Sequence, residues 1–302
     1  MPFVNPFTLG GRWWRGNVHA HSDRSDGDPT VAERFAGYRA AGYDFLVLTD
    51  HDVTGAVDDC STDDFLAIPG AELHPENPFG GDTYHILALN ILEPIPAREM
   101  HVSDVLKAIR ADGGLAVMAH PYWSGHVLSD YASLRDLYVG LEVYNHGAAT
   151  LNGTSCAELI WDAHLDRLGP VLGFAADDAH RRSDGVGGGW IMVRAETLDT
   201  AAVMGAVRDG AFYSTQGPTI ESLDVSVSDG RVRIDIACSA AQAVRFKGRT
   251  RTGRWVAAGD GGMSGAVYEC RGNEKYVRVE VIDAAGRKAW TNPIYLADVG
   301  GA

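Results

Sequence analysis

Several features that would assign the chain to a particular class of protein are scarce or missing. The four cysteines (Cys60, Cys156, Cys238 and Cys270) are far apart and form no Cys-x-x-Cys pair, which argues against a zinc ribbon and predicts reduced thiols. No apolar run approaches the roughly 20 residues that a membrane-spanning helix needs. The first 16 residues hold two prolines and no continuous apolar segment. They predict no secretory signal, so we expect a cytoplasmic protein without a membrane partner.

Positive charge is also in short supply. The chain has 26 Lys and Arg against 40 Asp and Glu, a net charge of −14, which argues against a broad nucleic-acid-binding surface. The excess is uneven: residues 219–302 hold 12 basic and 10 acidic side chains, leaving 14 and 30 for residues 1–218. Bound divalent cations would offset part of that acidic excess locally.

What the chain does contain is a dense histidine and carboxylate motif at Asn17–Gly27, NVHAHSDRSDG. His19 and His21 are two residues apart at the end of a predicted strand, so both imidazoles point to the same side. Asp26 follows on a turn. Two imidazoles and a carboxylate are metal ligands by type. This motif alone leaves a second interpretation open, in which both histidines are polar residues at a strand edge.

The same pattern recurs along the chain, because short apolar runs repeatedly end in His, Asp or Glu. The runs are 45–48 before His51, 65–71 before Glu72 and His74, 84–90 around His85, 115–119 before His120, 140–144 before Asn145 and His146, and 171–176 before Asp177, Asp178 and His180. Predicted helices alternate with them; the first has Asp28 as its N-cap and Pro29 at its first position. This alternation predicts an α/β barrel of parallel strands with these side chains at its carboxyl-end face.

The sequence pattern changes from Thr219 onward, where short segments of alternating apolar and polar residues are separated by glycine-rich turns. Asp229-Gly230 is typical of a tight hairpin. We therefore predict two domains: a barrel over residues 1–218 and a small all-β, sandwich-like domain over residues 219–302.

Four motifs in this order, HAHSDRSDG, LTDHD, GAE with AHP, and DDAH, resemble those of the PHP (polymerase and histidinol phosphatase) metal-dependent phosphoesterases. The resemblance implies a distorted barrel of seven β/α units with a trinuclear metal centre at the carboxyl ends of its strands. The segments FYSTQGP and KAWTNPIYL resemble a branch of this family that adds a β domain and includes carbamate hydrolases.

The resemblance also implies a ligand set. One metal would be held by His19, His21, Glu72 and Asp178, a second by Glu72, His85 and His120, and a third by Asp26, His51 and His180. The residues agree with this chemistry, because Glu72 has two carboxylate oxygens with which to bridge two cations. Mixed imidazole and carboxylate ligands suit zinc, manganese or iron, and we expect two or three such ions. His85 lies inside its apolar run and could instead be a core histidine.

Other residues near these motifs have both a functional and an ordinary interpretation. Asp50 and Asp177 could hydrogen-bond to the ligands or be solvated acids. Arg24, Arg181 and Arg182 could clamp a phosphate or lie on the surface. Tyr122 and Trp123 could form an aromatic wall or pack in the core. His74, His126 and His146 are expected at the rim or in loops, and Asn145 with His146 could touch the substrate.

Together these features predict a metal-dependent hydrolase, a PHP-type phosphoesterase acting on a small phosphorylated molecule with a metal-bridging hydroxide as nucleophile. One alternative is hydrolysis of a carbamate, amide or ester by the same cluster. Another is a non-catalytic, metal-binding regulatory module. The non-catalytic module is disfavoured because the chain retains a ligand-type residue at every ligand position of the motifs.

Overall fold

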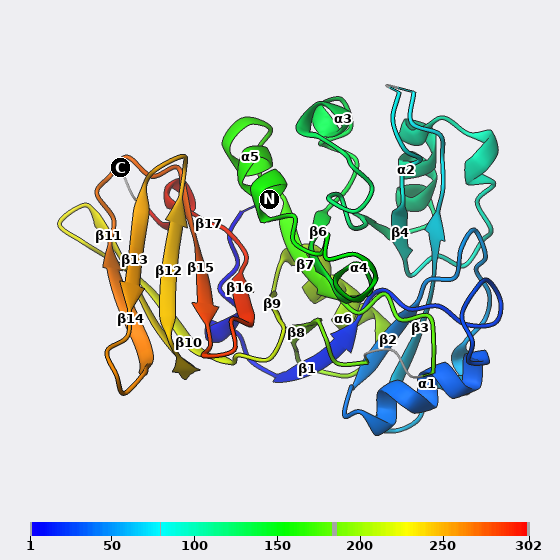
Figure 1. Cartoon of the computed structure of the whole chain (residues 1–302), viewed down its shortest axis with the longest axis horizontal. Helices are drawn as coiled ribbons and strands as arrows, with labels where there is room; N and C mark the ends of the chain where they lie inside the picture. Colours follow the sequence, from blue (N-terminus) through cyan, green and yellow to red (C-terminus); the bar gives the residue numbers. More distant parts are fainter. Residues whose placement is uncertain (1, 79, 183–185, 301–302) are drawn as a thin grey trace.

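The computed structural model describes residues 2–78, 80–182 and 186–300, which form a mixed α/β structure with many strands and few helices (Figure 1). Its helices are α1 (Val31–Ala40), α2 (Val102–Ala111), α3 (Leu128–Ala132), α4 (His146–Leu151), α5 (Glu158–Arg167) and α6 (Thr200–Asp209), with 3-10 turns η1 (Pro6–Thr8), η2 (Asp58–Cys60), η3 (Ala97–Glu99) and η4 (Leu296–Val299). None of the helices in these ranges is both long and apolar enough to cross a membrane.

The strands form one large and one small sheet. The strands of the first part are β1 (Arg12–Asn17), β2 (Phe45–Leu48), β3 (Leu66–Leu73), β4 (Ile86–Leu89), β5 (Leu115–Met118), β6 (Gly140–Asn145), β7 (Leu172–Ala176), β8 (Trp190–Ala195) and β9 (Phe212–Thr215). Those of the second part are β10 (Ile220–Ser228), β11 (Arg231–Ala241), β12 (Ala243–Gly248), β13 (Gly253–Ala257), β14 (Met263–Glu269), β15 (Tyr276–Ile282), β16 (Lys288–Thr291) and β17 (Ile294–Tyr295).

The large sheet does not confirm the predicted (β/α)7 barrel. Its strands pair in the order β13-β12-β15-β16-β9-β8-β1-β2-β3-β4-β5-β6-β7, with β17 beside β15, and no sheet within the described residues closes on itself. The regular alternation of strand and helix also fails. The parallel pair β2 and β3 is joined through the short turn η2 alone, and β3 and β4 form an antiparallel pair without a helix between them.

The direction of β4 matters for the position of His85. Strand β4 runs antiparallel to both β3 and β5, whereas β1, β2 and β3 are mutually parallel neighbours, as are β5, β6 and β7. His85 immediately precedes β4. Because β4 is reversed, its amino end lies at the same edge as the carboxyl ends of β3 and β5. His85 therefore reaches the edge where the other histidines collect.

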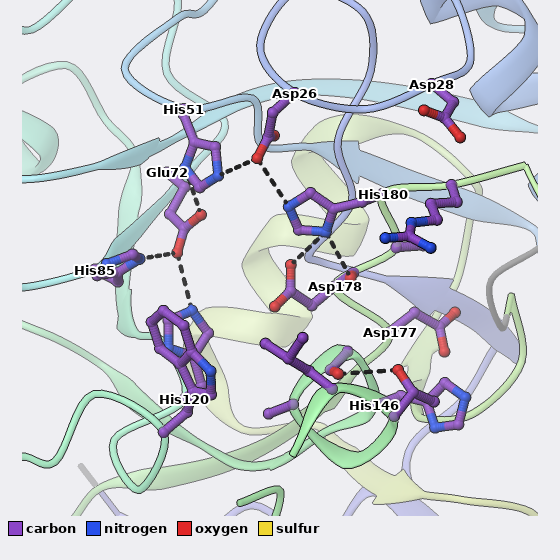
Figure 2. A pocket seen from close by; sticks show the side chains of 17 residues that line it. Asp26, Asp28, His51, Glu72, His85, His120, His146, Asp177, Asp178 and His180 are labelled. Atoms are coloured by element: carbon purple, nitrogen blue, oxygen red, sulfur yellow. Dashed lines mark hydrogen bonds and ion pairs between the residues drawn. The ribbon is translucent and has the colours of Figure 1, made fainter. Parts of the chain in front are cut away.

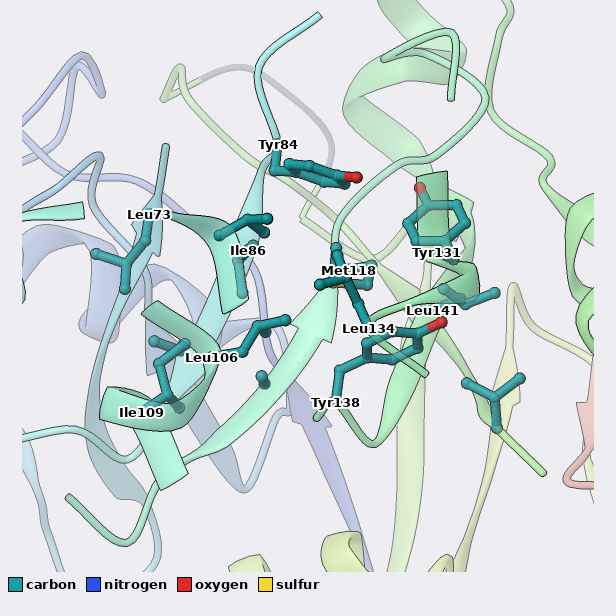
Figure 3. Close-up of a cluster of buried hydrophobic side chains, with 14 of the residues drawn as sticks. Leu73, Tyr84, Ile86, Leu106, Ile109, Met118, Tyr131, Leu134, Tyr138 and Leu141 are labelled. Carbon is teal, nitrogen blue, oxygen red and sulfur yellow. The ribbon is translucent and has the colours of Figure 1, made fainter. Parts of the chain in front are cut away.

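The central strands are buried on both faces, which explains their continuous apolar runs. Along β4, Ile86 and Ala88 enter one buried cluster, and Leu87 and Leu89 enter another. Helix α2 packs on the first cluster through Val102, Val105, Leu106 and Ile109, which lie on one helical face. Figure 3 shows Leu106 and Ile109 of this helix beside Ile86 and Met118. Helix α6 covers the second cluster with Val203, Met204 and Val207.

Helix α1 begins two residues later than predicted. Its N-cap is Thr30, not Asp28. The Thr30 hydroxyl accepts a hydrogen bond from the Glu33 amide at 3.3 Å, and the Glu33 carboxylate accepts one from the Thr30 amide at 2.8 Å. This reciprocal capping box satisfies two amides that a helix start otherwise leaves unpaired, and Asp28 has no comparable partner three residues later.

The C-terminal strands gather at one end of the molecule (Figure 1). The small sheet β10-β11-β14 and the strands β12 and β15 of the large sheet bury one shared apolar cluster, which includes Ile234, Ile236, Phe246 and Val279. The division at residue 218 stays a prediction. Strand β9 pairs with β16, so the large sheet continues across that position.

Candidate metal centre

The predicted ligand residues converge where β1, β2, β3, β5 and β7 end and β4 begins. Figure 2 labels all of them except His19 and His21. The segment after β1 lies beside the segment after β7, since Ala20 and Ala179 form a bridge, and His51 forms another with Glu72. Eight of the nine predicted ligands belong to groups whose possible ligand atoms lie within 4.8 Å of one another; these eight are His19, His21, Asp26, His51, Glu72, His85, His120 and His180. The ninth, Asp178, contacts three of them, His19, His21 and His180.

One group surrounds Asp26. The Asp26 Oδ2 atom lies 3.3 Å from His51 Nε2 and 3.4 Å from His180 Nε2, and Oδ1 lies 3.7 Å from His21 Nδ1. The His21 and His180 rings are stacked with their centroids 4.1 Å apart. Three imidazoles and a half-exposed carboxylate thus face one another at the open side of the cluster.

A second group lies deeper, around Asp178. Its Oδ1 atom is 3.2 Å from His19 Nε2 and 3.1 Å from His21 Nε2. Both histidines are fully buried. The two imidazoles therefore point to the same side of the segment after β1, as their spacing predicts, and both lie close to the carboxylate of Asp178, the second residue after β7.

Glu72 connects these groups with a third. Its Oε1 atom lies 2.8 Å from His85 Nδ1 and 3.1 Å from His120 Nε2. Its Oε2 atom lies 3.0 Å from His51 Nδ1, 3.4 Å from His19 Nε2 and 3.6 Å from His21 Nε2. The two oxygens of one buried carboxylate thus face separate sets of imidazoles, which is the arrangement that a bridge between two cations requires.

The electrostatics of the buried carboxylates favour cation binding. Burial by itself raises the pKa of Glu72, but the surrounding imidazoles, His19 foremost, bring that pKa well below its usual value. Burial also raises the pKa of Asp178, and His19 and His21 outweigh it in the same way. Both carboxylates are therefore ionised at neutral pH, which is the form that binds a metal.

The donor set fits a divalent metal, as the buried nitrogen atoms indicate. His19 Nε2 is buried and makes no aligned hydrogen bond, although Asp178 Oδ1 lies 3.2 Å away. The other nitrogen of the ring, Nδ1, lies 2.7 Å from Glu142 Oε1. With Nδ1–H donated to that carboxylate, the lone pair of Nε2 points into the cluster, which is how a metal-binding histidine is normally oriented.

Glu142 was not predicted as part of the site. It lies in β6, is 1% exposed, and its Oε2 atom accepts hydrogen bonds from the His120 amide at 2.8 Å and the Asn145 side chain at 2.9 Å. It therefore holds two predicted ligands, His19 and His120, from one position. An acid in the middle of the apolar run 140–144 was the sequence feature that could have identified it.

Asp50 and Asp177 lie beside the cluster, where their carboxylates hold loops. Asp50 accepts hydrogen bonds from the Ser22 amide at 2.6 Å and from the Ser25 hydroxyl at 2.9 Å, which orders the loop that carries Asp26. Asp177 accepts from the amides of residues 187, 188 and 189 at 2.8–3.1 Å and from Asn17 at 2.8 Å.

The cluster opens into a cavity of about 680 Å³. Its wall includes three of the predicted substrate residues, Trp123, His146 and Arg181, together with Asp28, Thr150 and Leu151. The Trp123 ring packs edge-on against His85 and His120, at centroid distances of 5.5 and 4.9 Å. The helix α4 supplies one side of this wall, and the histidine cluster supplies the other (Figure 2).

The other predicted substrate residues do not line the cavity. Arg24 donates to the Ala56 carbonyl at 3.0 Å, and Arg182 pairs with Glu33 at 2.5 Å on the surface. Tyr122 is 53% exposed. Asn145 is buried behind the cluster, where its side chain donates to Asp178 Oδ2 at 3.1 Å. Arg24 is close to Asp26 in sequence, but its side chain turns away to the carbonyl of a neighbouring loop.

The three histidines expected at the rim or in loops have different surroundings. His146 lies in the cavity wall at the start of α4, as expected. His126 is buried, with its ring nitrogens near the Tyr131 hydroxyl and the Asp82 carbonyl. His74 follows β3 but is only 6% exposed, and it contacts His51 inside the cluster.

Comparison with solved structures confirms the resemblance at the level of the fold. A two-domain protein from Bacteroides vulgatus that contains a predicted PHP-like metal-dependent phosphoesterase matches with a TM-score of 0.54 at 14% identity, over 94% of this chain and 95% of that one. The chain therefore has the fold of this two-domain PHP-like protein.

Two shorter matches cover just over half of this chain. One is an amidohydrolase from Chromobacterium violaceum with bound sulfate (20% identity, 56% of this chain and 88% of that one, TM-score 0.43). The other is a putative metal-dependent phosphoesterase from Bifidobacterium adolescentis (18% identity, 57% and 90%, TM-score 0.43). No family model matches the chain, and no curated protein matches it.

Proposed function

We propose that this protein is a metal-dependent hydrolase, and more narrowly a phosphoesterase that acts on a small phosphorylated molecule. The observation that carries the proposal is the position of Glu72, whose two oxygens face separate sets of imidazoles next to a cavity of about 680 Å³. A cavity of this size accommodates a small-molecule substrate. The likeness of the fold to a two-domain PHP-like protein supports the same class.

In this proposal the nine predicted ligands hold two or three divalent ions. When bound, such ions activate water for attack at neutral pH and stabilise the charge that develops on the substrate. Glu72 would hold two of the ions, because its two oxygens face separate sets of imidazoles. Glu142 orients His19 and the His120 backbone, and Asp50 holds the loop of Asp26, so that the ligands keep their positions during turnover.

The chain's own residues would also position the substrate. Trp123 stands beside His85 and His120 and offers a flat apolar surface to an organic group. Arg181 is the cationic side chain, histidines aside, among the described residues that line the cavity. Its guanidinium is suited to hold the outer oxygens of a phosphate ester through charge-assisted hydrogen bonds. The sequence offers Arg24 and Arg182 for the same role, but their side chains have partners outside the cavity wall.

A carbamate, amide or ester hydrolase is the second candidate. Among the described residues, the cavity wall holds one arginine and five carboxylates, those of Asp26, Asp28, Glu72, Asp177 and Asp178. A dianionic phosphate monoester enters such a field less readily than a neutral substrate unless the bound cations dominate.

The variant Arg181→Ala distinguishes the two candidates. If the substrate is a phosphate ester, we expect kcat/KM on phosphate esters to fall about 10- to 100-fold, the range for one lost charge-assisted contact, with neutral aryl esters and carbamates nearly unaffected. Arg182→Ala is the matched control, because Arg182 pairs with Glu33 outside the cavity. The enzyme reconstituted with manganese or zinc is assayed on all three substrate classes.

Equal losses on every substrate, or none on phosphate esters, would move the assignment to the carbamate or ester class. Hydrolysis of no substrate by protein that holds its metals would favour the non-catalytic module instead.

A further inference from the structure

His74 lies inside the cluster, although it belongs to none of the ligand positions proposed above. It directly follows β3, and its ring lies between His51 and His85, at centroid distances of 4.8 and 4.4 Å. Its Nε2 atom is 3.1 Å from His51 Nδ1. Two imidazole nitrogens at this distance need one donor and one acceptor.

The position of His51 decides which nitrogen is the donor. A neutral imidazole has a single free lone pair, so it binds one metal through one nitrogen and carries hydrogen on the other. His51 Nε2 faces Asp26 at 3.3 Å, within the group that also contains His180. A metal bound there takes the Nε2 lone pair, and His51 Nδ1 must then carry the hydrogen.

Two atoms near His51 Nδ1 can accept that hydrogen. Glu72 Oε2 lies at 3.0 Å and His74 Nε2 at 3.1 Å. In the proposed centre the Glu72 oxygens are engaged by bridging. His74 Nε2 is then the remaining acceptor, and its lone pair accepts the hydrogen of His51 Nδ1.

The same reasoning extends outward from His74. With Nε2 accepting, the hydrogen of His74 is on Nδ1. That buried atom lies 3.2 Å from Asp52 Oδ2 without the alignment of a hydrogen bond, so the carboxylate acts on the N–H group by charge at close range. Asp52 is itself held on both oxygens. Oδ1 accepts from the His74 amide at 3.0 Å, and Oδ2 accepts from Arg98 Nε at 2.6 Å. Arg98 is 70% exposed, so the chain of contacts runs from the surface to the cluster.

We propose that Arg98, Asp52 and His74 form a relay that fixes the ring orientation and the tautomer of His51. His74 is thus a positioning residue and not a metal ligand. The inference rests on the proposed metal-dependent function, and it adds a set of contacts that hold one ligand from behind. Asp52 links the relay to the rest of the site, because its own amide donates to the Glu72 carbonyl at 2.8 Å.

The test measures metal affinity, which is independent of hydrolysis. Wild type, His74→Phe, His74→Gln and Asp52→Asn are loaded with zinc and titrated with a competing chelator. Loss of a residue that orients a metal ligand typically weakens metal binding about 10- to 100-fold. We expect His74→Phe to bind one of its metals that much more weakly. His74→Gln should bind metal nearly as well as wild type, because its amide can still accept and donate a hydrogen bond. Asp52→Asn should show a smaller loss of affinity than His74→Phe.

His164→Phe is the matched control, since His164 is equally buried in α5 but binds the Tyr138 hydroxyl, outside the described cavity wall. It should keep full metal affinity. Wild-type metal affinity in His74→Phe would contradict the proposed relay. Equal losses of affinity in His74→Gln and His74→Phe would also contradict it, because His74 would then be a metal ligand. If His74→Phe does not fold, unchanged affinity in Asp52→Asn overturns it. Wild type that binds metal without hydrolysing any substrate counts against the proposed function alone.

Discussion

Replacing Glu72 by Gln is expected to reduce hydrolysis by at least about 100-fold while the protein stays folded. The amide keeps the shape of the side chain but removes the charge that would be shared by two cations. It also places an NH2 group against one set of imidazoles, where a metal must bind. Steady-state rates of the metal-reconstituted variant, with metal content and far-ultraviolet circular dichroism measured on the same sample, check this expectation.

A buried carboxylate outside the cluster provides the control for this change. Glu274 is 5% exposed and accepts hydrogen bonds from the Arg271 amide at 3.0–3.1 Å. Glu274→Gln should leave both turnover and metal content near the wild-type values. Near-normal turnover in Glu72→Gln with full metal content would show that Glu72 is not the bridge.

The second large effect is expected on stability, from Arg278→Leu. Arg278 lies in β15, is 0% exposed, and stacks 4.6 Å above the Trp161 ring of α5. Its Nε donates to Asp162 at 2.8 Å, and its Nη1 pairs with Glu280, which is also fully buried. Removing the arginine leaves the buried Glu280 carboxylate with less positive charge to balance it. Breaking a buried ion pair in this way typically lowers the free energy of unfolding by about 3–5 kcal/mol.

Urea denaturation of wild type and variant measures this loss. A surface arginine, Arg233, is the comparison, since it pairs with Asp235 at 3.3 Å in an exposed part of β11, and Arg233→Leu should change stability little. A loss below about 1 kcal/mol in Arg278→Leu would mean that the cavity left by the arginine repacks and that the ion pairs do not hold α5 against the C-terminal strands.

The gathering of the site residues could be predicted because it depends on local sequence. The apolar run 45–48 is β2, and the run 115–119 contains β5, so the histidines that follow each run lie at one sheet edge. The spacing of His19 and His21 needs only the period of an extended chain. These features are set within a few residues, and the sequence displays them directly.

Features that depend on chain direction or on distant contacts could not be predicted in the same way. A buried apolar run looks alike in a parallel and an antiparallel strand, so the reversal of β4 and the open sheet were missed. Arg24 was placed in the site by proximity in sequence, but long side chains choose among several partners, and Ala56 provides one outside the cavity. Glu142 has a local signal, an acid inside an apolar run, but its contacts with His19 and His120 depend on distant strands. The contact of His74 with His51 likewise depends on how β2 and β3 align.

The metal content of the purified protein tests the central claim most directly. After reconstitution with excess manganese or zinc and removal of unbound ions, elemental analysis should find about two or three divalent ions per chain, because the carboxylates and imidazoles described above surround Glu72 on both of its oxygens. Less than about one ion per chain in folded protein would contradict the account, since a cluster that binds no metal cannot supply the proposed chemistry.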